Sequence, residues 1–261
     1  TEHGAGDVVL GEVVAVESGK TTRVSLKTAL KPVVPQWVKK PYFWGLEDAS
    51  TKELLARFGE LEAQLVPAGT YNIVWRQAEH AAETVVLGAA AVLPDQLTEV
   101  KLSSAVHLVP ADWVPPELYY WALKDAATGA KAARFSLGFE PQLTAPGAYQ
   151  VIYRKSEHGS TDSYLGDLVV KEGEMTEFAL NTGIKLIPPP DLAPPYRIDF
   201  IELDAQGKAL RTVVQSGNFD AMLLKPGTYK VAYRQKEHDG STVTLVESVE
   251  LPVGNLLEIE L

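Results

Sequence analysis

Four of the five histidines in this 261-residue sequence directly follow a glutamate, and these Glu-His pairs recur at nearly regular intervals. In the last three copies an arginine stands three residues before the glutamate. A histidine beside a carboxylate can ligate a metal ion or act as a general base. The residues at this repeated position are His3 in the first copy, Arg76, Glu79 and His80 in the second, Arg154, Glu157 and His158 in the third, and Arg234, Glu237 and His238 in the fourth.

Two interpretations of the Glu-His position stay open. A metal site needs three or four convergent ligands, and each copy supplies only this pair at a shared position. Catalysis also seldom needs several identical sites in tandem. We therefore favour an inter-unit contact, in which Glu and His hydrogen-bond a loop of the neighbouring unit while Arg pairs with a carboxylate. A metal site is its main rival.

Aromatic residues in proline-rich loops form a second set of candidates. Trp37 and Trp113 stand at equivalent places in two copies, and Leu192 takes that place in the third. An exposed tryptophan in such a loop can stack on a sugar face. The leucine in the third copy favours packing at a junction between units instead. Trp44 and Trp121 lie on a predicted strand and are expected in or near the core.

Composition excludes several other functions. The chain has no cysteine, which rules out disulfides, thiol nucleophiles and thiolate metal sites. Its formal net charge of −10 at pH 7 argues against a surface for nucleic acid or anionic membrane. We find no glycine-rich phosphate loop, Ser/His/Asp spacing, zinc motif or EF-hand loop, and no run of eighteen apolar residues. No cofactor and no membrane insertion of this segment are expected.

The whole sequence is built from repeated phrases. "TEHGAGDVVLG" at residue 1 is followed by "AEHAAETVVLG", "SEHGSTDSYLG" and "KEHDGSTVTLV", and the last three follow "PAGTYNIVWRQ", "APGAYQVIYRK" and "KPGTYKVAYRQ". We therefore expect three complete units and a remnant of a fourth. The predicted divisions are 1–26 for the last two strands of an incomplete unit, 27–102, 103–180 and 181–261 for the complete ones.

Each complete unit is predicted to contain seven short strands. In 103–180 the apolar runs are roughly 104–109, 118–124, 132–137, 139–143, 148–154, 163–170 and 175–180. Turn signals between closely spaced runs are typical of an all-β sandwich. The segment 48–65 has leucines at helix-like spacing, but its counterparts predict strands, so we predict strand there as well.

The fifth strand carries large side chains in alternation. They are Tyr71, Ile73 and Trp75, then Tyr149, Val151 and Tyr153, then Tyr229, Val231 and Tyr233. Residues two apart share one face of a strand, which predicts a core position for all nine. An odd number of strands places entry and exit at opposite ends, so the units are expected head to tail. Their linkers are very short, which predicts a semi-rigid rod.

The phrase Pro-Gly-x-Tyr-x-Val-x-Tyr in the second half of the last two units, written PAGTYNIVW in the first, resembles the transthyretin-like and carboxypeptidase-regulatory-like sandwiches of bacterial surface proteins. Similar modules trail von Willebrand factor A domains or cell-surface enzymes. The resemblance implies tandem Ig-like or prealbumin-like sandwiches with a spacer or binding role, and it implies no enzymatic activity.

Three functions follow as hypotheses. The first is a non-enzymatic structural or adhesive array, the stalk or interaction segment of a larger extracytoplasmic bacterial protein that contacts other surface proteins. The second is a multivalent carbohydrate- or peptide-binding module that uses the junction loops. The third, an enzyme using the Glu-His pairs, is disfavoured. The valines in 7–16 would be exposed to solvent unless other strands cover them. An upstream part of the same polypeptide, or another chain, is expected to complete the unit to which residues 1–26 belong.

Overall fold

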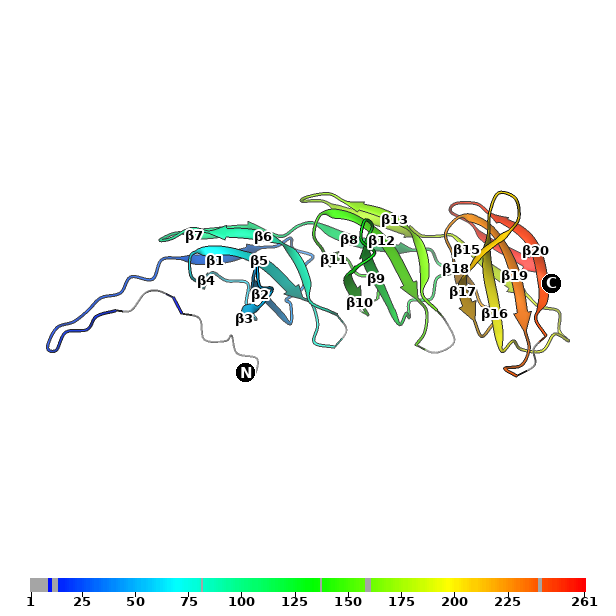
Figure 1. Ribbon diagram of the computed structural model, residues 1–261, viewed down its shortest axis with the longest axis horizontal. Helices are drawn as coiled ribbons and strands as arrows, with labels where there is room; N and C mark the ends of the chain where they lie inside the picture. The colour runs from blue at the N-terminus through cyan, green and yellow to red at the C-terminus, as the bar shows by residue number, and fades with distance from the viewer. Residues whose placement is uncertain (1–8, 11–13, 81, 137, 158–160, 239–240) are drawn as a thin grey trace. The chain divides into compact units, whose positions relative to one another are not determined.

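The computed structural model describes the chain except for residues 1–8, 11–13, 81, 137, 158–160 and 239–240. The described residues form twenty-one β-strands and no helix, so the predicted all-β class is confirmed (Figure 1). Among the described residues there is accordingly no helix long and apolar enough to cross a membrane.

The strands form three sets of seven, which we call sandwiches 1, 2 and 3. Sandwich 1 consists of β1 (Ala29–Val33), β2 (Phe43–Asp48), β3 (Leu54–Phe58), β4 (Gln64–Leu65), β5 (Gly69–Arg76), β6 (Val85–Val92) and β7 (Leu97–Lys101). Sandwich 2 consists of β8 (Ala105–Pro110), β9 (Tyr120–Asp125), β10 (Lys131–Phe135), β11 (Gln142–Leu143), β12 (Gly147–Arg154), β13 (Ser163–Val170) and β14 (Met175–Leu180). Sandwich 3 consists of β15 (Gly183–Ile187), β16 (Arg197–Leu203), β17 (Ala209–Ser216), β18 (Met222–Leu223), β19 (Gly227–Arg234), β20 (Val243–Leu251) and β21 (Leu256–Glu260).

Each set forms a four-stranded and a three-stranded sheet. In sandwich 1 the orders are β3-β2-β5-β6 and β4-β1-β7, and the same orders recur in the other two sets. The first and last strands of a set run parallel, as β1 with β7 and β15 with β21, while their other described pairings are antiparallel. Seven strands in a four-plus-three arrangement are those expected of an Ig-like sandwich.

The cores lie between the two sheets of each set. In sandwich 3 the buried cluster draws Ile184 and Met222 from the small sheet and Phe200, Val214 and Tyr229 from the large one. All nine side chains predicted to alternate on the fifth strand are buried. Trp44 and Trp121 are fully buried as predicted, and burial of such a side chain stabilises the fold by about 1.5–3 kcal/mol.

The repeated Gly-x-Tyr phrase closes a turn. The hydroxyl of Tyr71 donates to the carbonyl oxygen of Pro67 at 3.1 Å, and that of Tyr229 donates to the carbonyl oxygen of Lys225 at 2.7 Å. A Cβ on Gly69 would lie 2.9 Å from the Tyr71 hydroxyl, so only glycine leaves room for this bond. The tyrosine therefore ties the start of the central strand to the loop before it.

The helix-like segment 48–65 forms strands β3 and β4, as predicted. Ala56 and Phe58 are buried on one face of β3, while Leu55 between them is 40% exposed. Phe58 packs against Trp44 with 4.6 Å between ring centroids. Tertiary packing on the neighbouring strand β2 therefore overrides the local helical spacing.

The described contacts group the chain into two compact units. The first comprises Thr1–Val106, Pro141–Gly147 and Val170–Thr176, and the second comprises His107–Glu140, Ala148–Val169 and Glu177–Leu261. Sandwich 2 thus contributes residues to both units. The boundaries predicted at 26/27, 102/103 and 180/181 stay predictions, and all contacts described below lie within one unit.

Candidate functional site

Glu79, Glu157 and Glu237 lie in the hairpins that connect the fifth and sixth strands of the sandwiches. Arg76, at the end of β5, donates from Nε to the carbonyl oxygens of Ala78 at 3.3 Å and Ala82 at 3.0 Å, and from Nη2 to that of Glu79. Its guanidinium therefore satisfies backbone acceptors of its own hairpin, a use suited to a planar group with five donors.

Arg154 repeats this arrangement in sandwich 2. It donates from Nε to the carbonyl oxygen of Ser156 at 3.1 Å and from Nη2 to that of Glu157 at 2.7 Å. The spacing Arg-x-x-Glu thus places the guanidinium against the backbone of the glutamate three residues later. The repeated phrase stabilises the hairpin locally in both sandwiches.

The glutamate side chains meet a tyrosine from the proline-rich loop. Glu79 Oε1 accepts the Tyr42 hydroxyl at 3.1 Å, and Glu157 Oε1 accepts the Tyr119 hydroxyl at 3.2 Å. Arg76 lies 5.8 Å from the Tyr42 ring centroid, and Arg154 lies 5.5 Å from that of Tyr119. Partial burial, together with the bond to Glu79, raises the pKa of the Tyr42 hydroxyl.

Sequence reasoning missed these tyrosines. Tyr42 and Tyr119 lie far from the hairpins along the chain, but both directly precede or begin a second-strand phrase, "YFWGL" or "YYWAL", that the copies share. That shared phrase was the signal from which the two tyrosines could have been identified.

The described bonds of the predicted Arg and Glu residues all lie within their own sandwich. Their predicted inter-unit contact stays a prediction.

The side chains of His80 and His238 are exposed to solvent. His80 Nε2 lies 3.7 Å from Glu79 Oε2 with its side chain 90% exposed, and His238 Nε2 lies 3.9 Å from Glu237 Oε2 with its side chain 94% exposed. His3 and His158 lie outside the described residues. No group of three or more His, Asp or Glu among the residues that the structure describes is arranged to hold a metal ion.

Trp113 packs where sandwich 3 begins. A Cβ on Gly183, the first residue of β15, would lie only 2.6 Å from Cη2 of the Trp113 ring. The indole therefore rests directly on the backbone of β15 and is half-buried. Trp37 is also half-buried, and its predicted sugar stacking stays untested. Leu192, at the equivalent place in sandwich 3, packs on the core of its own sandwich.

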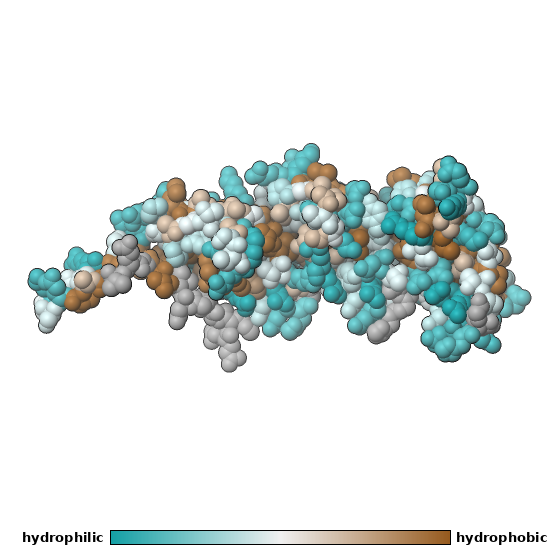
Figure 2. Space-filling model, viewed as in Figure 1, coloured by the Kyte–Doolittle hydropathy of each residue, from teal (hydrophilic) through white to brown (hydrophobic). Residues whose placement is uncertain are grey.

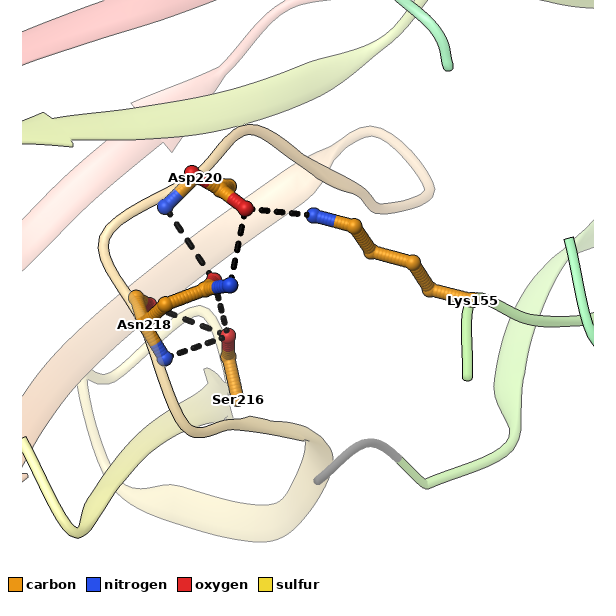
Figure 3. Close-up of polar contacts among 4 residues, drawn as sticks. All are labelled: Lys155, Ser216, Asn218 and Asp220. Atoms are coloured by element: carbon orange, nitrogen blue, oxygen red, sulfur yellow. Dashed lines mark hydrogen bonds and ion pairs between the residues drawn. The ribbon is translucent and has the colours of Figure 1, made fainter. Parts of the chain in front are cut away.

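We use the term 2–3 junction for the contact between sandwiches 2 and 3 inside the second compact unit. At this junction Lys155, the residue after Arg154, reaches a loop of sandwich 3 and places Nζ 3.0 Å from Asp220 Oδ2 (Figure 3). The Asn218 amide donates to the same oxygen at 2.7 Å, and Ser216 Oγ donates to Asn218 Oδ1 at 3.1 Å. In sandwich 2 the residue after Arg154 thus contacts the next sandwich through its ammonium group.

The interior of the 2–3 junction is largely apolar. Ser163 Oγ donates to the carbonyl oxygen of Leu223 at 3.4 Å, and the backbone N–H of Gln215 donates to Thr161 Oγ1 at 3.1 Å. Beside these bonds lies a cavity of about 280 Å³ whose lining includes Leu165, Leu180, Leu223, Pro226 and Val253. Burial raises the pKa of Tyr164, the residue before Leu165, to about 12, with a contribution from its bond to Asp167.

Equivalent residues line a cavity of about 690 Å³ in the first compact unit. Leu87, the third residue of β6, corresponds to Leu165 in β13, and Pro146 corresponds to Pro226 in the following Pro-Gly turn. Leu102 and Leu180 close the same repeated phrase. The junction cavity is therefore a repeated feature, which sequence reasoning did not predict.

The segment before β1 differs from the prediction. Residues 14–28 contain no strand, although 1–26 were predicted to hold the last two strands of an incomplete unit. Two strands without a third are marginally stable, and the described residues offer this segment no sheet to join. Val9, Val14, Val16, Val24 and Leu26 are 45–80% exposed, and Figure 2 shows hydrophobic residues scattered over the surface of the molecule. Residues 1–8 and 11–13 lie outside the described residues.

Comparisons with known proteins give distant matches only. No family model and no curated protein matches the chain. Among solved structures, the Bacillus anthracis TIE protein aligns over 89% of this chain and 50% of its own, at 12% identity and a TM-score of 0.24. The chain thus spans about half the length of that protein.

Two pilins align over most of both chains. A streptococcal ancillary pilin aligns over 89% of this chain and 98% of its own, at 11% identity and a TM-score of 0.21. BcpA, the major pilin subunit of Bacillus cereus, aligns over 90% of this chain and 97% of its own, at 11% identity and a TM-score of 0.22. Scores this low establish neither a shared fold nor a function, so the sandwich assignment rests on the strand order described above.

Proposed function

We propose that this chain is a non-enzymatic structural repeat segment of a larger extracytoplasmic bacterial protein, where it acts as a spacer or adhesive stalk for other domains. The proposal covers the surface location as well as the role. The exposed valines before β1 fit it, since a sandwich supplied by an upstream part of the polypeptide, or by another chain, would cover them.

The 2–3 junction is the observation that carries the proposal. Only Asn181 and Thr182 separate β14 from β15, and Trp113 packs on the first residue after them. A linker of two residues has little freedom, and the packed indole with the Lys155–Asp220 pair restricts it further. A fixed joint of this kind transmits position and load from one sandwich to the next, as a spacer requires.

The same geometry weakens the ligand-binding alternative at one position. A tryptophan that stacks on a sugar needs a free ring face, whereas Trp113 is in contact with the Gly183 backbone. Packing therefore accounts for Trp113. Trp37 remains the residue on which a carbohydrate- or peptide-binding role would depend.

Pulsed electron spin resonance tests the spacer role. The chain has no cysteine, so the double variant Ala127→Cys and Gln206→Cys carries spin labels at these two positions alone, in equivalent turns of sandwiches 2 and 3. We expect one narrow distance distribution in the full chain. A matched control inserts a Gly-Ser-Gly-Ser linker between Asn181 and Thr182, which should broaden the distribution. A distribution as broad without the insertion as with it would refute the proposal.

A further inference from the structure

We propose that the cavity at the 2–3 junction is a binding site for a small, neutral ring compound that is mostly apolar and carries one hydrogen-bond acceptor oxygen. The cavity has a volume of about 280 Å³, and its lining residues all belong to the second compact unit. Binding of such a compound goes beyond the spacer role and does not depend on it.

The walls of the cavity come from both sandwiches. Sandwich 2 supplies Leu165 from β13 and Leu180 from β14, and sandwich 3 supplies Leu223 from β18. These leucines are 7%, 1% and 4% exposed, so packing in their own sandwiches fixes their side chains. The short linker and the bond from Ser163 to Leu223 hold the two walls apart. The space between the walls therefore persists, and an apolar molecule can occupy it.

Phe178 gives one wall an aromatic character. Its ring lies against the backbone of β13, where a Cβ on Gly166 would be 3.4 Å from Cζ of the ring. The side chain is half-buried, and Phe178 is one of the residues that line the cavity. Aromatic rings prefer offset or edge-to-face contact with other rings. A planar ring compound therefore suits this wall better than a flexible alkyl chain does.

The volume of the cavity limits the size of the compound. An apolar protein cavity of about 150 Å³ can bind benzene, so about 280 Å³ accommodates about eleven non-hydrogen atoms by proportion. A pair of fused rings with one small substituent has this size. A monosaccharide is of similar size, but its hydroxyl groups would lack partners along walls of leucine.

Asn181 supplies a hydrogen-bond donor at the cavity. Its Oδ1 accepts the Thr182 hydroxyl at 3.3 Å, and the Thr182 oxygen in turn accepts the backbone N–H of Gly254 at 2.8 Å. The Nδ2 amide of the half-buried Asn181 has no acceptor among the described residues. It lies beside the turn that carries Val253, another lining residue, since a Cβ on Gly254 would be 3.7 Å from it. A carbonyl oxygen on the ring compound can accept this amide.

The charges around the cavity favour a neutral compound. None of the residues that line it, all within the described part of the chain, carries a charge. Lys225, next to the lining residue Pro226, already pairs with Glu202 at 2.5 Å. An ionised ligand would lose its hydration without gaining a counter-charge, and the net charge of −10 would repel an anion further.

The equivalent cavity in the first compact unit has a different chemistry. Its volume is about 690 Å³, and Glu99, Lys101 and Glu172 are among its lining residues. Glu172 takes the place of Val253, and Ser103 takes the place of Asn181. This cavity is too large and too charged for the same compound. We therefore expect binding at the 2–3 junction alone.

Methyl NMR of the full chain is the test, with 1-tetralone as the probe, a neutral compound of two fused rings and one carbonyl oxygen. The methyl resonances of Leu165, Leu180 and Leu223 should shift with a Kd on the order of 0.1–1 mM. Those of Leu87 and Leu102, which line the cavity of the first unit, should stay in place. No saturable shift at the three leucines at about 2 mM would overturn the proposal, and so would equal shifts at both cavities.

A matched pair of exposed valines tests the location. Val253 lines the cavity and is 74% exposed, while Val169 on β13 is 62% exposed and is not among the lining residues. Val253→Trp should weaken binding of 1-tetralone about tenfold, because the indole occupies the mouth of the cavity. Val169→Trp should bind it as the unmodified chain does. Equal affinities in the two variants would overturn the location.

A second pair tests the acceptor oxygen. Tetralin has the same rings as 1-tetralone without the carbonyl group, so the unmodified chain should bind it about fivefold more weakly. Asn181→Asp keeps an acceptor for the Thr182 hydroxyl but lacks the amide donor, and it should lose the preference for 1-tetralone. An unmodified chain that binds both compounds equally would overturn the role of Asn181, and with it the chemistry proposed for the ligand.

Discussion

Single hydrogen bonds explain why some residues of the repeat recur. The Tyr229 hydroxyl is buried and donates to the Lys225 carbonyl oxygen, and Tyr71 does the same to Pro67. Asp48 accepts the Ser50 hydroxyl at 2.6 Å and the amides of Ser50 and Thr51 at 2.8 Å each. In both cases one side chain holds a turn that the chain must make before the next strand.

Tyr229→Phe should destabilise sandwich 3. The substitution keeps the ring in the core but removes the only donor described for the Lys225 carbonyl oxygen, which should lower the free energy of unfolding by about 1 kcal/mol. Urea unfolding of the full chain measures the change. Tyr196→Phe, at a 44% exposed tyrosine, is the control and should leave the midpoint unchanged. Equal shifts in both variants would contradict this role for Tyr229.

Ser50→Ala should raise the pKa of Asp48. The Ser50 hydroxyl, followed by the amides of Thr51 and Ser50, lowers this pKa from 3.8 to about 2. Because the folded pKa lies below the ordinary one, the stabilisation by the ionised carboxylate is fully present above about pH 4 and is lost as the pH falls toward 2. Carbon-13 NMR titration of the Asp48 carboxyl group measures its pKa. An unchanged pKa in the variant would show that the Ser50 hydroxyl is not the main cause of the lowered value.

At the scale of elements, the hairpin between the fifth and sixth strands is held by its own arginine. Arg154 bonds two backbone carbonyls of the hairpin, while Glu157 bonds Tyr119 from the proline-rich loop. The hairpin is thereby attached to the start of β9. A stiff hairpin explains how Lys155, next in the chain, can reach Asp220 at low entropic cost.

Arg154→Gln should loosen this hairpin. The shorter neutral side chain cannot reach both carbonyls, and the loss of two charge-assisted bonds should cost about 2 kcal/mol of local stability. Hydrogen exchange measured by mass spectrometry should accelerate in the peptide that covers the ends of β12 and β13. His238→Ala, at a side chain 94% exposed, should leave exchange in the corresponding hairpin of sandwich 3 unchanged. Unchanged exchange in Arg154→Gln would show that the hairpin does not depend on it.

Sequence patterns predicted the elements better than their contacts. Period-two alternation placed Tyr229, Val231 and Tyr233 in the core, because a strand in a sandwich repeats its environment every second residue. The partner of Glu157 was missed because Tyr119 is brought to it only by the pairing of β9 with β12. The segment before β1 was predicted as strands from its likeness to other copies, but a strand also needs a neighbouring strand to bond.

At the scale of the molecule, the 2–3 junction combines an ion pair with an apolar contact that contributes more to its stability. Asp220 is 62% exposed, and ion pairs at such surfaces are worth about 0–1 kcal/mol. Full burial of a large apolar side chain is worth about 1.5–3 kcal/mol, and the half-buried Trp113 is joined at this joint by buried leucines. The contact of Trp113 with Gly183, together with the leucines around the cavity, should therefore dominate the rigidity of the joint.

Two substitutions separate these contributions. Trp113→Ala should broaden the distance distribution between labels at Ala127→Cys and Gln206→Cys, because it removes the ring that rests on β15. Lys155→Ala should leave the distribution narrow, and raising the salt concentration should have equally little effect on the unmodified junction. The opposite pattern, with a broad distribution in Lys155→Ala and a narrow one in Trp113→Ala, would mean that charge holds the joint. In that case the rigidity of the joint would depend on ionic strength rather than on the contact between Trp113 and Gly183.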